Sequence, residues 1–291
     1  MTSFSDSRPR RSVLYVPANS ERALEKIPSL DCDVVILDLE DAVAPEAKDA
    51  AREAMRHFLR ESRPANCGIV IRINPLASEW GTEDLLAARA ARPDAILLPK
   101  VDGPRDVLDA DAALDEMDAP PGLALWAMVE TPKAIFNLGA TAELGRDPAA
   151  RLGCLVAGTN DLIKETGVLA TPDRRYLVPW LLQLVAAARA AGIDALDGVM
   201  NDFRDMDAFE SECIEGRNMG FDGKTLIHPA QIEVANRIFM PSENEIAAAE
   251  EVVAAFAQPE NAGKGVIAVG GRMVERLHLG QAERLLAKVG R

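Results

Sequence analysis

Short apolar segments alternate with helical patterns along most of this chain, and no other feature of the sequence constrains the fold as strongly. Eight such segments precede eight helical stretches between residues 11 and 240. This alternation predicts a parallel sheet with right-handed crossovers, and eight units in about 230 residues match the size of a (β/α)8 TIM barrel. A doubly wound Rossmann-like sheet is the alternative. It is weakened because neither a G-x-G-x-x-G motif after the first strand nor a P-loop motif occurs.

The expected elements are bounded mostly by Pro, Gly and polar residues, which end strands and begin helices. The strands are predicted at residues 11–17, 34–38, 68–73, 95–98, 123–129, 152–157, 195–199 and 223–227. The helices are predicted at residues 21–26, 44–60, 80–91, 104–117, 132–144, 177–191, 205–219 and 229–239.

Both ends of the chain fall outside this pattern. Residues 1–10 carry no apolar periodicity, and we expect a disordered leader there. The predicted barrel domain covers residues 11–240, and a C-terminal extension follows at residues 241–291. In the extension we expect a helix at 243–257, a hairpin at 266–274 that turns at Gly270-Gly271, and a last helix at 275–289. Since the extension is too small to fold alone, it should pack on the barrel or on a neighbouring subunit.

Composition narrows the class of protein. The 291 residues carry a net charge of −14, and the calculated pI is about 4.8. This balance argues against a nucleic-acid binder, which usually presents a basic face. The sequence contains neither an apolar run of transmembrane length nor a signal-peptide pattern, so we expect no membrane partner. Four dispersed cysteines without a CxxC motif are typical of reduced, structural thiols, and we expect a cytoplasmic protein.

Charged residues crowd the ends of the predicted strands, where a barrel places its chemistry. The stretch from Asp33 to Pro45 shows this most clearly, because a buried strand runs directly into a cluster of acids. Any single charge could be an ordinary solvated loop residue. Charges after six of eight strands are harder to explain in that way. The charged and polar residues at these strand ends are Asn19, Ser20, Asp38, Glu40, Asp41, Arg72, Asn74, Lys100, Glu130, Asn160, Asp161 and His228.

Glu130 and Asp161 follow consecutive strands, which lie about 4.8 Å apart in a sheet. Two carboxylates that meet there repel unless one is protonated or a cation lies between them. Two oxygen ligands, with positions left for water and substrate, suit Mg²⁺, and Mn²⁺ is possible. Zinc is disfavoured because no pair of His or Cys is near. An acid/base couple without metal is the alternative.

Two cationic residues also end strands. The planar guanidinium of Arg72 suits a carboxylate or keto acid, and an ion pair with Glu40 or Asp41 is the alternative or coexisting role. Lys100 could act as a Schiff-base nucleophile only with a lowered pKa. Because several carboxylates are near, we expect its pKa to rise, and we favour an electrostatic role for Lys100.

The motifs RSVLYVPANSERALEK, VVILDLEDAVAP, IRIN, LPKV, VETP, GTNDL and GKTLIHPAQI occur in this order. As an ordered set, they closely resemble the citrate lyase β-subunit-like (CitE-like) proteins of the HpcH/HpaI aldolase superfamily, with malyl-CoA and citramalyl-CoA lyases nearest. The resemblance spans roughly residues 10–240 and part of the extension.

The resemblance implies a (β/α)8 barrel, bound Mg²⁺, a homotrimer or hexamer, and acyl-CoA lyase chemistry on a CoA thioester and a small 2-oxo acid. By motif, Glu130 and Asp161 would bind the metal and Arg72 would hold the substrate carboxyl group. Asp41, with Glu40, would orient metal-bound water and Arg72. The residues implied to contact substrate or CoA are Tyr15, Asn19, Lys26, Arg72, Ile227 and His228.

The extension departs from the family pattern. Relatives with this extension carry a motif like DGKMID, whose last Asp acts as acid or base in a neighbour's active site. Here Glu275 takes that position and Leu277 replaces the following Pro. One extra methylene matters, because displacing a catalytic group by about 1 Å can cost a hundredfold in rate. An ordinary acidic residue at a helix N-terminus is the alternative role for Glu275.

Three functions follow. The leading hypothesis is reversible C–C cleavage of a 3-hydroxy dicarboxylyl-CoA such as malyl-CoA or citramalyl-CoA, which gives glyoxylate or pyruvate plus acetyl- or propionyl-CoA. The altered extension motivates the second, a malyl-CoA thioesterase on the same scaffold. The third is a citrate lyase β-like subunit of a larger complex.

Overall fold

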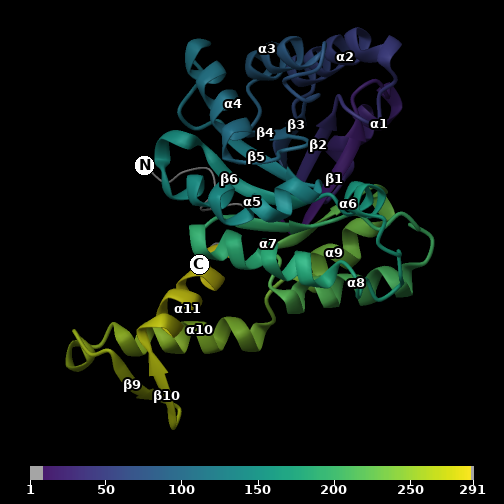
Figure 1. The fold of residues 1–291 in the computed structure, drawn as a ribbon. Helices are drawn as coiled ribbons and strands as arrows, with labels where there is room; N and C mark the ends of the chain where they lie inside the picture. The colour runs from purple at the N-terminus through teal and green to yellow at the C-terminus, as the bar shows by residue number, and fades with distance from the viewer. Residues whose placement is uncertain (1–8, 290–291) are drawn as a thin grey trace. The chain divides into compact units, whose positions relative to one another are not determined.

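Eight parallel strands close into a barrel in this computed structural model, which describes residues 9–289 (Figure 1). Each strand pairs with the next along the chain, and β8 closes the ring by pairing with β1. The (β/α)8 barrel is therefore confirmed. The strands are β1 (Ser12–Pro17), β2 (Val34–Asp38), β3 (Gly68–Arg72), β4 (Ala95–Leu98), β5 (Ala124–Val129), β6 (Leu152–Ala157), β7 (Asp194–Asp197) and β8 (Gly223–Leu226).

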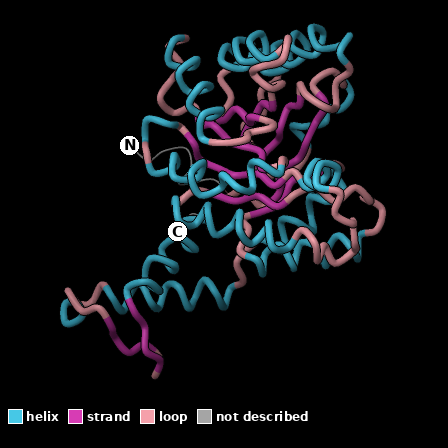
Figure 2. The backbone as a smooth tube through the Cα atoms, in the orientation of Figure 1, coloured by secondary structure: helices cyan, strands magenta, loops and turns pink. Residues whose placement is uncertain are grey.

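Helices follow every strand and surround the sheet (Figure 2). They are α1 (Glu21–Lys26), α2 (Lys48–Glu61), α3 (Gly81–Ala91), α4 (Pro104–Glu116), α5 (Pro132–Glu143), α6 (Thr159–Thr166), α7 (Val178–Ala191), α8 (Met206–Met219) and α9 (Ile232–Phe239). Short 3₁₀ turns lie at Ile27–Ser29, Pro45–Ala47, Leu144–Arg146, Pro148–Ala150 and Pro229–Gln231. Predicted and observed bounds mostly differ by one or two residues.

Helix α6 was not predicted from the sequence. It begins directly after β6 and Gly158, and it ends at Gly167, which adopts the left-handed conformation with φ 71°. Its eight residues, TNDLIKET, include only two apolar side chains, Leu162 and Ile163, and of these two only Leu162 is buried. A helix this short and polar shows too little apolar periodicity to be detected, yet it fixes the position of Asp161.

Strand residues alternate between the barrel interior and the helix layer, as the period of two requires. The interior cluster is mostly aliphatic, with Trp126, Met128, Cys154 and the partly buried Tyr15 among its members, while a much larger cluster packs between strands and helices. Ile36 and Val70 point inward. Two residues further on, the same alternation turns Asp38 and Arg72 toward the interior at the C-terminal end of the barrel.

The N-terminal end of the barrel strands corrects the predicted extent of the leader. Residues 1–8 of the predicted leader lie outside the described residues, but Arg10 is only 4% exposed. It forms an ion pair with Asp194, and its guanidinium lies 5.0 Å from the ring centroid of Trp126. Arg10 therefore belongs to the barrel rather than to a leader, because a buried guanidinium needs such partners.

The chain divides into two compact units, and the barrel unit is Arg10–Phe239. The remaining C-terminal residues contain α10 (Glu243–Phe256), a 3₁₀ turn (Pro259–Asn261), a hairpin of β9 (Val266–Val269) and β10 (Arg272–Glu275), and α11 (Arg276–Lys288). The predicted hairpin and its turn are confirmed. Gly270 and Gly271 both have positive φ, at 55° and 77°, as a two-residue hairpin turn demands. Packing of this unit on a neighbouring subunit stays a prediction.

Candidate active site

Arg72, at the end of β3, is held by a residue of the neighbouring strand. Its Nε donates to Asp38 Oδ1 at 2.7 Å and its Nη2 donates to Asp38 Oδ2 at 2.6 Å. The two residues are opposite each other in the β2–β3 register, which explains this bidentate pairing. Burial lowers the pKa of Arg72, but the bonds to Asp38 outweigh that effect and raise it. The sequence pointed to Glu40 or Asp41 as the partner, and Asp38 is the main one.

The other two acids of this stretch lie near Arg72 in different surroundings. Glu40 Oε2 lies 2.8 Å from Arg72 Nη1, and Asp41 Oδ2 lies 3.9 Å from the same nitrogen. Glu40 is buried, and burial raises its pKa to about 8, which favours the protonated carboxyl at neutral pH. The Asp41 side chain is 65% exposed and can meet a ligand from solution.

Lys48, which the sequence reasoning missed, fixes the loop that carries these acids. Its Nζ donates to the carbonyls of Leu39 and Glu40, both at 2.8 Å, and to Asn74 Oδ1 at 2.9 Å. Lys48 is 5% exposed, and burial lowers its pKa. The sequence does carry one sign of this role, because Lys48 lies on the apolar face of α2, three residues before the buried Ala51.

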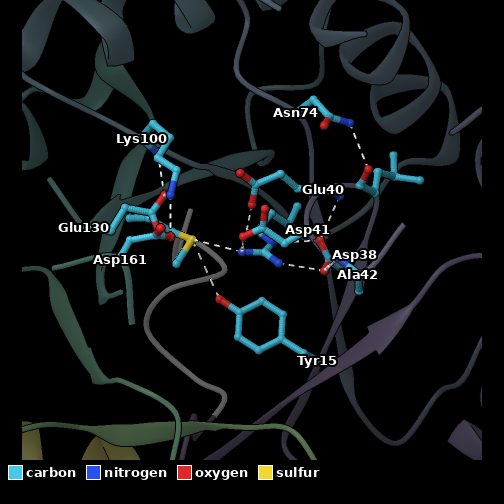
Figure 3. A network of polar contacts seen from close by, with 12 residues as sticks. Tyr15, Asp38, Glu40, Asp41, Ala42, Asn74, Lys100, Glu130 and Asp161 are labelled. Atoms are coloured by element: carbon cyan, nitrogen blue, oxygen red, sulfur yellow. Dashed lines mark hydrogen bonds and ion pairs between the residues drawn. The ribbon is translucent and has the colours of Figure 1, made fainter. Parts of the chain in front are cut away.

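Tyr15 lies inside the barrel beside Arg72. The Arg72 guanidinium is 4.9 Å from the Tyr15 ring centroid, and the Tyr15 hydroxyl donates to Met128 Sδ at 3.8 Å (Figure 3). Burial raises the pKa of the Tyr15 hydroxyl. The structure therefore places Tyr15 where its ring can orient Arg72 through a cation–π contact.

Glu130 and Asp161 converge on one cationic group, the ammonium of Lys100 (Figure 3). Lys100 Nζ forms an ion pair with Asp161 and lies 3.5 Å from Glu130 Oε1. The Lys100 N–H also donates to Glu130 Oε1 at 2.7 Å. Burial lowers the pKa of Lys100, but the Asp161 hydrogen bond and the two carboxylate charges outweigh it, so the predicted rise is confirmed. Burial also raises the pKa of Glu130.

The surroundings of Glu130 fit a divalent cation. A Cβ at Gly158 would lie 2.4 Å from Glu130 Cβ and 2.6 Å from its Oε2, so only glycine lets the carboxylate sit here. Within residues 9–289, no group of three or more His, Cys, Asp or Glu side chains is arranged to hold a metal. A cation between Glu130 and Asp161 would take its remaining ligands from water or substrate, an oxygen set that suits Mg²⁺ or Mn²⁺.

A cavity of about 220 Å³ lies against β1 and α1. Of the predicted CoA contacts, Tyr15, Lys26 and Ile227 line it, whereas Asn19 and His228 do not. Asn19 is exposed in the turn after β1. The His228 ring stacks on Phe203 with centroids 4.4 Å apart. The remaining lining residues are Leu14, Val16, Pro17, Ser20, Arg22, Ala23, Leu30 and Pro229.

Glu275, the predicted acid of the extension, belongs to the C-terminal unit. It ends β10, and its N–H donates to His278 Nδ1 at 2.9 Å as α11 begins. This geometry matches the alternative role of an acidic residue at a helix N-terminus. Its catalytic role stays a prediction.

Comparison with known proteins identifies the family. The sequence profile of the HpcH/HpaI aldolase/citrate lyase family matches residues 11–229. The chain belongs to this family. The resemblance inferred from the motifs is thus confirmed. The matched range begins just before β1 and ends just after β8, and so includes every strand of the barrel.

Individual members of the family differ in named activity. A (3S)-malyl-CoA thioesterase of Cereibacter sphaeroides is 46% identical over 97% of this chain and 95% of its own length. The mitochondrial citramalyl-CoA lyase of Rattus norvegicus is 33% identical over 96% of this chain and 85% of its own. The crystal structure of CitE from Mycobacterium tuberculosis with magnesium, acetoacetate and coenzyme A covers 99% of this chain and 100% of its own, with TM-score 0.74 and 29% identity.

No helix within residues 9–289 is long and apolar enough to span a membrane.

Proposed function

We propose that this protein is a Mg²⁺-dependent thioesterase that hydrolyses a 3-hydroxy dicarboxylyl-CoA of the malyl-CoA type. The observation that carries the proposal is the convergence of Glu130 and Asp161 on one cation position at the barrel end that also holds Arg72. The 46% identity to a malyl-CoA thioesterase over 97% of the chain supports hydrolysis over the C–C cleavage that the sequence motifs favoured.

Substrate binding follows from the charges around the barrel mouth, which is the C-terminal end of the barrel strands. The CoA moiety lies in the cavity beside β1, where Arg22 and Lys26 supply positive charge for its phosphates. The free carboxylate of the acyl group binds Arg72 through Nη1, because Asp38 already holds Nε and Nη2. Glu40, whose raised pKa favours the protonated carboxyl at neutral pH, competes only weakly for that nitrogen.

Glu130 and Asp161 would hold the metal. When bound, Mg²⁺ supplies Lewis-acid polarisation of a substrate oxygen. Asp41, the exposed acid of the mouth, accepts a proton from the attacking water. The water oxygen bonds to the thioester carbon, the C–S bond breaks, and the departing thiolate takes up a proton. The products are a 3-hydroxy dicarboxylate and free CoA.

C–C cleavage is the second candidate, supported by the 33% identity to a citramalyl-CoA lyase. Cleavage leaves a CoA enolate that needs a proton donor, and Glu275 of a neighbouring copy is the residue that the motif comparison suggests. A homotrimer or hexamer and a cytoplasmic location stay predictions. A β-like subunit of a larger complex is the remaining alternative.

The test is product analysis with the purified chain and Mg²⁺. Malyl-, methylmalyl- and citramalyl-CoA are incubated separately, free thiol is followed with time, and the acids and CoA species are separated by chromatography. With malyl-CoA, hydrolysis gives malate and one free thiol per turnover, whereas cleavage gives glyoxylate and acetyl-CoA without free thiol. Glu130→Gln is the control, with an expected loss of about 10²–10³-fold. Turnover of none of the free esters would contradict both activities and favour the complex-bound subunit.

A further inference from the structure

Lys100 occupies the position between Glu130 and Asp161 that a divalent cation would take. We propose that Lys100 is the resident cation of the metal-free site, and that its ammonium must leave both carboxylates when a metal ion binds. The inference rests on the metal site of the proposed function. It adds that the affinity of this site for metal is limited by a side chain of the protein itself.

The backbone at Lys100 is built for this position. Lys100 lies two residues after the end of β4, and its φ of 51° is in the left-handed region that residues other than glycine rarely adopt. This conformation costs free energy and persists where surrounding contacts hold it, often at functional sites. Here it lets the N–H contact Glu130 Oε1 at 2.7 Å while the ammonium of the same residue reaches Asp161.

The ammonium can also leave. The Lys100 side chain is 28% exposed and that of Asp161 is 19% exposed, so solvent reaches the pair. Lys224 provides the contrast within the same barrel, because its side chain is 0% exposed and its Nζ contacts Asp197, Glu212 and the carbonyl of Gly198. A lysine on a flexible four-carbon stem at the solvent edge can change partners, whereas a sealed one cannot.

The positive charge of Lys100 has opposite effects on the metal-free site and on the metal-bound site. Without metal, the Lys100 ammonium offsets the repulsion between two carboxylates that meet at one point. With metal, an ammonium and a divalent cation at the same point repel each other, so binding must break the Lys100–Asp161 ion pair. Removing the ammonium should therefore tighten metal binding and destabilise the metal-free protein.

The experiment measures Mn²⁺ binding directly, by the loss of the free-ion EPR signal, to the unmodified protein and to Lys100→Met. Lys133→Met is the matched control, because it removes the same charge from an exposed lysine that pairs with Asp102 instead. Thermal unfolding of each protein in EDTA and in saturating Mn²⁺ is the second readout. Neither readout depends on catalysis.

We expect Lys100→Met to bind Mn²⁺ at least about fivefold more tightly than the unmodified protein, the size of one partly exposed ion pair. Its midpoint in EDTA should fall, and Mn²⁺ should restore it. Lys133→Met should change neither value. If the unmodified protein binds Mn²⁺ and Lys100→Met binds it equally or more weakly, the inference is wrong and the metal site stands. If neither protein binds Mn²⁺, the metal site itself is wrong and the inference is overturned with it.

Discussion

Two of the clusters of opposite charges on this barrel differ in how completely the charges are sealed from solvent. Between β7, β8 and the helices outside them, Asp197 binds Arg174 at 2.8 Å and Lys224 at 3.0 Å, with Asp197 and Lys224 fully buried. At the mouth, Glu130 is buried, but Lys100 and Asp161 reach solvent. The first cluster is closed, so it can serve only the fold. The second can exchange its cation, which is what a binding site needs.

The largest predicted effect breaks the closed cluster. Asp197→Ala removes the fully buried carboxylate that pairs with both Lys224 and Arg174, and leaves these buried cations with Glu212 and Glu215 alone. This should cost ~3–5 kcal/mol in the free energy of unfolding. Urea unfolding monitored by circular dichroism measures it. Asp173→Ala, which removes an exposed carboxylate paired with Arg175, should leave the midpoint unchanged. A small effect of Asp197→Ala would mean that the closed cluster does not support the fold as argued.

A smaller effect tests the packing around the mouth cluster. Gly158→Ala places a methyl group 2.4 Å from Glu130 Cβ, and the resulting displacement should cost ~1–3 kcal/mol in stability. It should also weaken Mn²⁺ binding, which isothermal titration measures. Gly139→Ala, in α5 with nothing near the added methyl group, is the control and should not reduce stability. Unchanged metal binding in Gly158→Ala would contradict the tight seating of Glu130.

The last prediction concerns pH. The pKa of Glu40 is raised by burial from 4.5 to about 8, so the folded state binds a proton that the unfolded state has released. The stability from this group is complete below about pH 4.5 and is lost as pH rises toward and through 8. Urea midpoints at several pH values should therefore fall less steeply over this range in Glu40→Gln than in the unmodified protein. Parallel slopes for the two proteins would contradict a protonated Glu40.

The fold was predictable because eight apolar segments alternate with helical patterns along the chain, and the segments are short and apolar throughout, as strands buried on both faces are. The position of the site was predictable for the same reason, since parallel strands end at one edge. Glu130, Asp161 and Arg72 could be placed there from order along the chain alone.

The partners could not be predicted, because they depend on register and on side-chain direction. Asp38 holds Arg72 because the β2–β3 register places them opposite each other. Lys48 reaches the loop from the apolar face of α2, and its contacts are far apart in sequence. The left-handed conformation of Lys100, which aims its ammonium at both carboxylates, leaves no mark in the sequence.

The central claim is that Glu130 and Asp161 form a metal site at the barrel mouth. Anomalous diffraction from crystals soaked in Mn²⁺ tests it most directly, with Glu130→Gln crystals as the control. We predict one strong peak within bonding distance of both carboxylates, with the Lys100 ammonium moved away from Asp161, and no such peak in Glu130→Gln. A map without a peak at this position, or with Lys100 still bridging the carboxylates beside a metal bound elsewhere, would contradict the account.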